Sequence, residues 1–153
     1  MKNILTIDVE EIFHTEYAKQ GTLKRDFKTP SNLPRVIELL ETYGAKATFF
    51  ILGEIAEIFP GILEEIRGGG HEVAFHGYDH EPLWRLTEEK FKGEIEGFDQ
   101  LLRRSLGERC IGFRAPSLSL NNDTRWALKV LADAGYRYDS SIIPAKTPLY
   151  GSP

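Results

Sequence analysis

Short apolar runs separated by longer amphipathic stretches constrain the fold of this chain more than any other feature. The run from Lys46 to Leu52 is almost continuously apolar, which is typical of a parallel strand covered on both faces. Further short runs of this kind occupy residues 4–7, 71–75, 110–113 and 136–138. Stretches with helical periodicity lie between them. The alternation predicts an α/β fold with parallel strands joined by right-handed crossovers.

The predicted helices have recognisable beginnings and breaks. Ser31 is expected to cap a helix that runs to Tyr43. A helix over residues 54–67 contains Pro60, which lacks a backbone N–H and should interrupt it. Two more helices are predicted, one from Thr87 to about Leu106 and one from Asn122 or Asp123 through Ala134.

The composition fits one globular domain over residues 1–153, with 41% hydrophobic and 27% charged residues. The net charge of −4 argues against a nucleic-acid partner and gives no attraction to an anionic membrane. Cys110 is the single cysteine, so an intrachain disulfide cannot form. The sequence shows no signal-peptide pattern and no apolar run of transmembrane length. We therefore expect a cytoplasmic protein without nucleic-acid or membrane partners.

Polar residues directly follow four of the five predicted strands. The carboxyl ends of parallel strands lie at one end of a barrel or sheet, where active sites are built. Residues far apart in the sequence are therefore expected to meet there. They are Asp8 and Glu10 after the first strand, His76 and His80 after the third, Arg114 after the fourth and Asp139 after the fifth.

His76 and His80 are the strongest candidates for metal ligands. Imidazoles four residues apart lie on one face of a helical turn and can bind one ion. A third ligand, expected to be a carboxylate, would complete a catalytic divalent metal site with an open position. The alternative is a pair of surface histidines near a loop. Their position after a buried strand, with acidic residues after another strand, favours the metal site.

The segment Asp8-Val9-Glu10 supplies the acidic residues. In an extended segment, Asp8 and Glu10 point to the same side. One carboxylate could then bind the metal while the other takes a proton from water activated by it. The alternative is that these acids only end a strand and cap the next segment of the chain. Glu11 is interpreted as a solvated acid or a cap.

The segment from Arg114 to Ser117 is the third element of the predicted site. Arg114 can hold a carboxylate in a fixed orientation, and Asp8 is its expected partner. Pro116 would stiffen the loop, so that a backbone N–H near Ser117 could face a developing oxyanion. An ordinary structural salt bridge is an equal alternative. Asp139 could orient Arg114 or belong to a turn or cap.

Two other histidines have less specific interpretations. His14 lies in the loop after the first predicted strand and could approach a substrate, although nothing in the sequence requires it. His71 is expected to be a structural histidine at the entrance of the third strand.

Three segments resemble the first motifs of the polysaccharide deacetylases, which are carbohydrate esterase family 4: residues 6–10, 71–80 and 113–117. The segment Asp139-Ser140-Ser141 resembles the start of the fourth. The resemblance implies a distorted (β/α) barrel with fewer repeats than a TIM barrel. It also implies zinc, or alternatively cobalt, nickel or iron. The implied reaction is attack by metal-activated water on the acetamide carbonyl of N-acetylated sugars, in a polysaccharide or peptidoglycan-like substrate.

Carried over by position, the family roles fall on six residues of this sequence. The resemblance implies that Asp8 is the catalytic base, that Glu10, His76 and His80 are the metal ligands, that Arg114 orients the base, and that the oxyanion donor lies near Ser117. Trp84, outside this set, could form a wall of the sugar site or pack in the core.

Two departures from the family pattern affect the functional prediction. The acids are separated by Val9 instead of being adjacent, a form that resembles a branch linked to exopolysaccharide or peptidoglycan deacetylation. In addition, no histidine follows His80, although the family's last motif carries one that protonates the leaving amine. We hypothesise that the chain is the amino-terminal part of a longer deacetylase, or a truncated form, whose barrel lacks its last strands. It would be weakly active or inactive alone, or be completed by the missing segment or by another copy.

Two other functions are compatible with the same residues. One is hydrolysis of another non-peptide C–N bond, such as that of a cyclic ureide or imide. The other is a catalytically impaired module that binds carbohydrate or supports assembly.

Overall fold

The computed structural model describes residues 3–15, 18 and 23–143. Strands and helices alternate through these ranges, as the sequence predicts. The strands are β1 (Leu5–Val9), β2 (Ala47–Ile51), β3 (Glu72–Phe75), β4 (Gly112–Phe113) and β5 (Tyr138–Asp139). The α-helices are α2 (Thr29–Thr42), α3 (Gly53–Ile58), α4 (Gly61–Gly68), α5 (Glu88–Leu106) and α6 (Trp126–Asp133). Three short 3₁₀ helices are η1 (Ile12–His14), η2 (Leu83–Arg85) and η3 (Pro116–Leu118).

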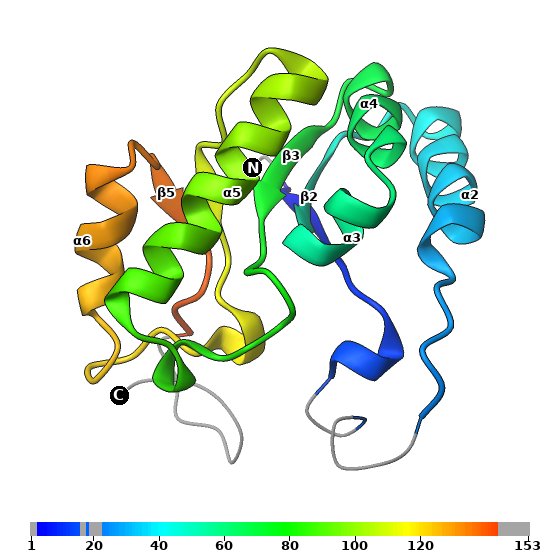
Figure 1. Ribbon diagram of the computed structural model, residues 1–153. Coiled ribbons are helices and arrows are strands. Elements are labelled where there is room, and N and C mark those ends of the chain that lie inside the picture. Colours follow the sequence, from blue (N-terminus) through cyan, green and yellow to red (C-terminus); the bar gives the residue numbers. More distant parts are fainter. Residues whose placement is uncertain (1–2, 16–17, 19–22, 144–153) are drawn as a thin grey trace.

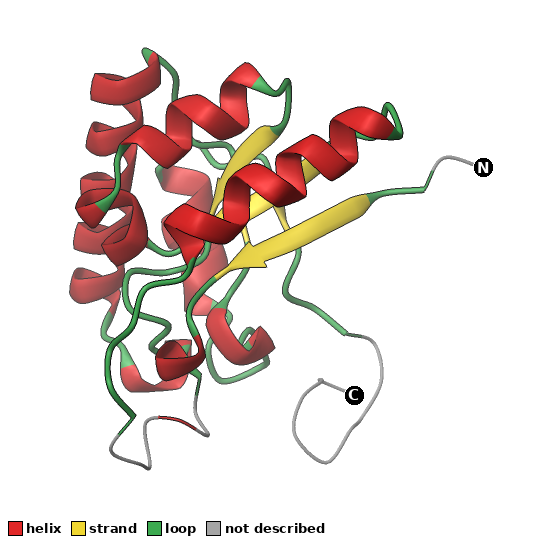
Figure 2. Ribbon diagram, turned by 90° about the vertical axis from the view of Figure 1, so that its right-hand side faces the viewer, coloured by secondary structure: helices red, strands yellow, loops and turns green. Residues whose placement is uncertain are grey.

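The five strands form one parallel sheet in the order β1-β2-β3-β4-β5. Each crossover therefore returns to the neighbouring strand, and the helices gather on one side of the sheet (Figures 1 and 2). This arrangement is typical of the wall of a (β/α) barrel. A doubly wound sheet would instead carry helices on both faces. The predicted parallel α/β architecture is confirmed.

The hydrophobic core fills the space between the sheet and its helices. Strands β2, β3 and β4 contribute Phe49, Phe75 and Phe113, all fully buried. Helix α5 lies over them, and its Phe98 ring stacks on Phe75 with 4.6 Å between the centroids. Burying one such side chain stabilises the fold by ~1.5–3 kcal/mol. The core therefore fixes the sheet from which the loops of the site project. No helix in the described ranges is long and apolar enough to cross a membrane.

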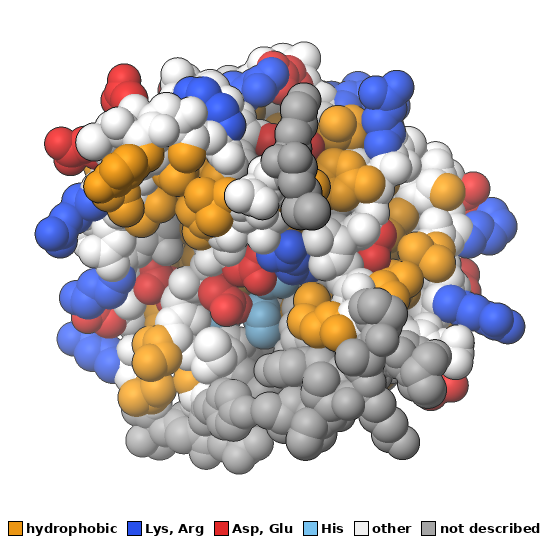
Figure 3. All heavy atoms as spheres, turned by 180° about the vertical axis from the view of Figure 1, so that it is seen from behind, with side chains coloured by type: hydrophobic (Ala, Val, Ile, Leu, Met, Phe, Trp, Pro, Cys, Tyr) orange, Lys and Arg blue, Asp and Glu red, His pale blue; other side chains and the backbone are white. Residues whose placement is uncertain are grey.

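The opposite face of the sheet carries polar side chains. Alternation along β2 turns Phe50 to this face, where the Arg114 guanidinium lies 4.1 Å from the ring centroid. Thr48 donates a hydrogen bond to the Glu72 carboxylate at 2.7 Å on neighbouring strands. Figure 3, seen from this side, shows acidic, basic and imidazole side chains gathered near the centre of the face. In a (β/α) barrel this face would point inward.

The helix boundaries confirm some of the expected signals. Pro60 separates α3 from α4, as predicted. Thr87 caps α5, because its hydroxyl accepts the Lys90 N–H at 3.2 Å. Gly107 ends the same helix in a left-handed conformation, with φ of 69°.

Two predicted caps are wrong. Helix α2 begins at Thr29, before Ser31, because Glu11 accepts the N–H groups of Lys28 and Thr29 at 2.8 and 2.6 Å. A residue on another loop thus takes the role expected of a local serine, and Glu11 is a cap.

Helix α6 begins at Trp126 and not after Asn122 or Asp123. Asn121 accepts the Asp123 N–H at 2.8 Å instead, which makes a turn before the helix.

The Thr87 cap allows a direct test. Thr87→Ala should lower the free energy of unfolding by about 1 kcal/mol, because the N–H of Lys90 loses its acceptor. Thr42→Ala is the matched control, since that hydroxyl donates to the carbonyl of Glu38 within α2 and its loss should cost less than about 0.5 kcal/mol. Urea unfolding followed by circular dichroism measures both. Equal losses would show that Thr87 does not cap α5.

Candidate metal centre

The loops after β1 and β3 bring together one carboxylate and two imidazoles. Among the described residues, Glu10, His76 and His80 each offer a ligand atom, and these atoms lie within 4.8 Å of one another. The Oε2 atom of Glu10 lies 2.9 Å from Nε2 of His80. The three side chains line a cavity of about 250 Å³, together with Asp8 and Ser117. One cation could contact all three ligands from this cavity.

The orientation of His76 leaves one ring nitrogen available to a metal. Its Nδ1 atom lies 2.7 Å from the carbonyl oxygen of Arg114. A carbonyl only accepts hydrogen bonds, so Nδ1 carries the proton and Nε2 keeps its lone pair. Burial lowers the pKa of His76 and favours the neutral ring. Neutral imidazole is the form that binds metals.

His80 reaches the site by a different route from the one predicted. Residues 78–80 form a bend and not a helical turn, and the φ angles of Gly77 and His80 are 80° and 62°. The two imidazoles still meet, with ring centroids 5.3 Å apart. The helical interpretation fails because the loop packs against Pro116, where a Cβ atom on Gly77 would lie 2.9 Å from Pro116 Cγ.

The electrostatic setting of Glu10 favours its ionised form. Burial, the largest single influence, raises the pKa of Glu10, but the contact with His80 and the nearby imidazoles of His76 and His14 together lower it, and the net shift is downward. An ionised carboxylate beside two imidazoles is a suitable oxygen ligand for a divalent cation.

Arg114 contacts Asp8, the partner expected from the sequence. Its Nη1 atom donates to Asp8 Oδ1 at 2.6 Å, and Nη2 donates to Thr6 Oγ1 at 3.1 Å. The side chain extends from the end of β4 over Phe50 to β1, and the residue opposite Phe50 on β3 is the small Ala74. The second Asp8 oxygen, Oδ2, lies 3.8 Å from His76 Nε2. Asp8 is thus held on one side and faces the candidate metal ligands on the other.

Asp139 is connected by hydrogen bonds to the loop after β4. Within the described part of the chain, its carboxylate makes no direct hydrogen bond to Arg114. Its carboxylate accepts the N–H and the hydroxyl of Ser141 at 3.1 and 2.5 Å. The Ser141 oxygen in turn accepts the Ala115 N–H at 2.7 Å. The contact with Arg114 comes from Ser140, whose carbonyl and hydroxyl oxygens accept at 3.1 and 2.8 Å. The turn interpretation of Asp139 therefore describes its local geometry.

The loop at Pro116 and Ser117 closes another side of the cavity. Ser117 and Leu118 have positive φ angles of 53° and 48°, which are unusual for residues with side chains. Such backbone strain tends to occur at functional sites. The Leu118 N–H already donates to Ala115 O at 3.0 Å. The oxyanion role predicted for this loop therefore falls on the N–H of Ser117, and it stays a prediction.

Buried His14 positions the acidic loop, a role that differs from the approach to a substrate considered from the sequence. Its Nδ1 accepts the Glu11 N–H at 3.0 Å, and its Nε2 donates to Glu54 Oε2 at 2.9 Å. Arg25 pairs with the same Glu54 carboxylate. The loop that carries Glu10 is thereby attached to the first turn of α3. No local pattern indicates this contact, because Glu54 is 40 residues away.

The remaining candidates lie outside the cavity. His71 accepts the Ala47 N–H at 3.3 Å, as a structural histidine would. Trp84 lies in η2 with half of its surface exposed, so the core alternative is wrong, and it is not among the residues that line the cavity.

A family model for polysaccharide deacetylases matches residues 19–138 of this chain. The chain belongs to the polysaccharide deacetylase family. It is 35% identical over 95 residues to a Bacillus cereus peptidoglycan-N-acetylglucosamine deacetylase. The aligned region covers 61% of this chain and 34% of that protein. It is 30% identical over 119 residues to a Helicobacter pylori peptidoglycan deacetylase, and this aligned region covers 77% of this chain and 40% of that protein. The chain thus spans well under half the length of these relatives.

Solved structures share the fold of this family member. A family 4 carbohydrate esterase from Streptomyces lividans, in complex with acetate, has a TM-score of 0.66 and 23% identity, covering 92% of this chain and 60% of that one. A pseudoenzyme of the same family from Bacillus anthracis has a TM-score of 0.70 and 20% identity, covering 89% and 41%. Because an esterase and a pseudoenzyme both share the fold, the fold alone does not decide whether the chain is catalytic.

The packing of Gly77 against Pro116 generates a stability prediction. Gly77→Ala should lower the free energy of unfolding by about 1–3 kcal/mol, because it adds a left-handed non-glycine residue and a contact of 2.9 Å with a rigid ring. Gly44→Ala is the control, with φ of +59° and no atom within 4 Å of the added Cβ, and should lose about 1 kcal/mol or less. Thermal unfolding measures both. Equal losses would mean that Pro116 does not constrain the loop of His76 and His80.

Proposed function

We propose that this chain carries the metal-binding and base-bearing part of a hydrolase that removes N-acetyl groups from the sugars of a polysaccharide or of peptidoglycan. The observation that carries the proposal is the approach of Glu10, His76 and His80 to within 4.8 Å, beside an Asp8 carboxylate fixed by Arg114. Family membership and the name of the Bacillus cereus relative support the substrate class.

The donor set fits a divalent cation. Two imidazole nitrogens and one carboxylate oxygen, open on one side to a cavity, are typical of catalytic zinc with three protein ligands. Cobalt, nickel and iron accept the same donors. The Arg114 carbonyl supports the metal-binding orientation of His76, as outer hydrogen bonds do in metal sites. We therefore propose zinc or one of these ions as the cofactor.

Asp8 is proposed as the general base. A divalent cation in this site would lower the pKa of a water molecule and polarise the acetamide carbonyl. Arg114 holds Oδ1 of Asp8, and this leaves Oδ2 on the side of His76 to accept the proton of the attacking water. The Arg114 guanidinium has hydrogen-bond donors and no acceptor, so it orients the base and does not accept the proton itself.

The backbone N–H of Ser117 is proposed to stabilise the oxyanion. Ser117 lines the same cavity as the candidate ligands. The hydrogen bonds from Asp139 through Ser141 to Ala115 fix the backbone two residues before Ser117. The contact of Pro116 with Gly77 fixes the residue directly before Ser117. A fixed donor of this kind acts without reorganisation during the reaction.

Metal content and acetate release separate the proposed roles. His76→Ala and His80→Ala should abolish metal binding, because each removes one of three ligands. Asp8→Asn should keep the metal and lower turnover by about a hundredfold or more, because an amide cannot take the proton. Elemental analysis and release of acetate from an N-acetylglucosamine oligomer provide the measurements.

Loss of metal in all three variants would contradict the assignment of Asp8. Metal retained by the unaltered chain without any acetate release would favour the carbohydrate-binding alternative.

Arg114→Lys tests the orientation of the base. Lysine keeps the charge but cannot donate to Asp8, Thr6 and Ser140 at once, so kcat should fall by about tenfold to a hundredfold with little change in KM. Metal content should be unchanged. Arg103→Lys, a surface substitution on α5, is the control and should leave both constants unaltered. A rise in KM alone would show that Arg114 binds substrate and does not orient Asp8.

A further inference from the structure

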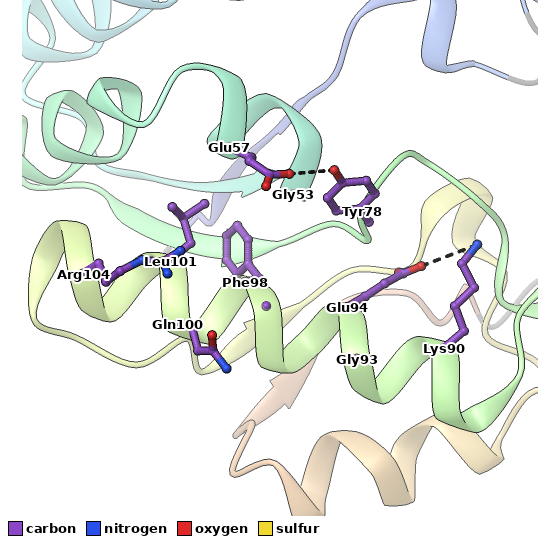
Figure 4. A pocket seen from close by; sticks show the side chains of 11 residues that line it. Gly53, Glu57, Tyr78, Lys90, Gly93, Glu94, Phe98, Gln100, Leu101 and Arg104 are labelled. Carbon is purple, nitrogen blue, oxygen red and sulfur yellow. Dashed lines mark hydrogen bonds and ion pairs between the residues drawn. The ribbon is translucent and has the colours of Figure 1, made fainter.

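A second cavity, of about 390 Å³, lies among α3, α5 and the loop that carries Tyr78 (Figure 4). This volume is within the range of small-molecule sites, about 300–1,000 Å³. Among the described residues, it shares no lining residue with the cavity of the candidate metal centre. Its walls are formed by residues that include Gly93, Glu94, Gly97 and Gln100 of α5, Glu57 of α3 and Tyr78.

Two glycines on one face of α5 leave space for the cavity. Gly93 and Gly97 are four residues apart, so they lie one above the other. A Cβ atom built on either would meet no atom of the described residues within 4 Å, apart from the backbone of the helix itself. Glycine destabilises a helix interior relative to alanine, and packing against this chain does not require it at either position. The open face alone does not identify a ligand.

The carboxylate of Glu94 gives the independent indication of a ligand. Its side chain is only 9% exposed, and within the described residues Oε1 is buried without a hydrogen-bond partner. The nearest cation, Lys90 Nζ, is 3.9 Å away, beyond hydrogen-bond distance. Burial raises the pKa of Glu94 to about 7, although Lys90 and the Tyr78 backbone oppose the shift. A bound donor would supply the missing partner of this oxygen.

The neighbouring groups define the chemistry that the cavity would accept. The Tyr78 hydroxyl donates to Glu57 Oε2 at 2.6 Å, and Figure 4 shows this pair across the cavity from α5. Gln100 offers an amide, Leu101 an apolar surface, and Lys90 and Arg104 positive charges at the rim, so the buried oxygen of Glu94 is the group left for a cationic donor. The one group of metal-ligating side chains in the described chain lies elsewhere, at Glu10 and the two histidines. The cavity thus suits a small organic molecule with a cationic donor and several hydroxyl groups.

We propose that this cavity is a second binding site for an amino sugar, whose ammonium group pairs with Glu94 and whose hydroxyl groups bond to Glu57 and Gln100. The choice of an amino sugar rests on the proposed function, because removing an N-acetyl group leaves a primary amine on the sugar. An N-acetylated sugar carries no cation for Glu94, so the site discriminates deacetylated from acetylated units. Tyr78 lies between His76 and His80 in the sequence, and an occupied site therefore contacts the metal-binding loop.

Calorimetric titration of the whole purified chain tests the proposal with four probes: glucosamine, N-acetylglucosamine, glucose and ethanolamine. Glucosamine should bind at least about tenfold more tightly than each of the others. Glu94→Gln keeps the shape of the side chain without its charge, and should weaken glucosamine binding by about tenfold or more. Glu96→Gln, an exposed position on the same helix, is the matched control and should have no effect.

Gly97→Leu fills the cavity and should also abolish the binding of glucosamine. The added Cβ meets no neighbouring atom and leucine favours a helix, so a circular dichroism melt should show that the variant is folded. Glucose or ethanolamine binding as tightly as glucosamine, or glucosamine binding unchanged in Glu94→Gln, would overturn the proposal.

The titration distinguishes this proposal from the proposed function. Glucosamine binding and acetate release are both measured on the unaltered chain, because no ligand of the metal centre lines this cavity. Glucosamine binding without any acetate release would count against the deacetylase proposal alone. Acetate release without glucosamine binding would count against the second site alone.

Discussion

The contacts of Arg114 hold the candidate metal centre together. Its guanidinium crosses the sheet from the end of β4 to β1, stacks on Phe50 and fixes Asp8, while its carbonyl oxygen orients His76. One residue thus determines the position of the proposed base and of one proposed ligand. A planar cation with several donors can do this where an ammonium group could not. The parallel sheet makes the contact geometrically available, since it places the ends of β1, β3 and β4 at one edge.

The sequence predicted those parts of the fold that depend on local patterns. Apolar runs located all five strands, Pro60 marked a helix boundary and Thr87 marked a cap. The predicted set of site residues also converges, because strand ends meet in any parallel sheet. Motif spacing could not give the backbone path between His76 and His80, since positive φ angles and packing against another loop determine it.

Contacts between distant loops could not be predicted from the sequence. Glu11 caps a helix that begins 18 residues later, and His14 contacts a glutamate 40 residues away. Both are buried polar groups whose partners come from another element. A buried polar group needs a partner somewhere, but the sequence does not say where that partner lies. The expectation that Ser31 would cap α2 was wrong for this reason: the carboxylate of Glu11, on another loop, accepts N–H groups at the start of the helix.

The first turn of α3 connects the two loops of the metal centre. The N–H groups of Gly53 and Glu54 donate to the carbonyl oxygens of Gly77 and Tyr78, at 2.9 and 3.0 Å, and so hold the loop between the histidines. The Glu54 side chain bonds to His14, which holds the loop of Glu10. The candidate metal-binding residues after β1 and β3 are therefore positioned by the first turn of α3, in addition to Arg114. Tyr78 also forms a wall of the second cavity. A molecule bound there would therefore contact a loop whose carbonyl groups already accept hydrogen bonds from α3. Occupancy would thus restrain the loop between the two histidines and would not require it to move.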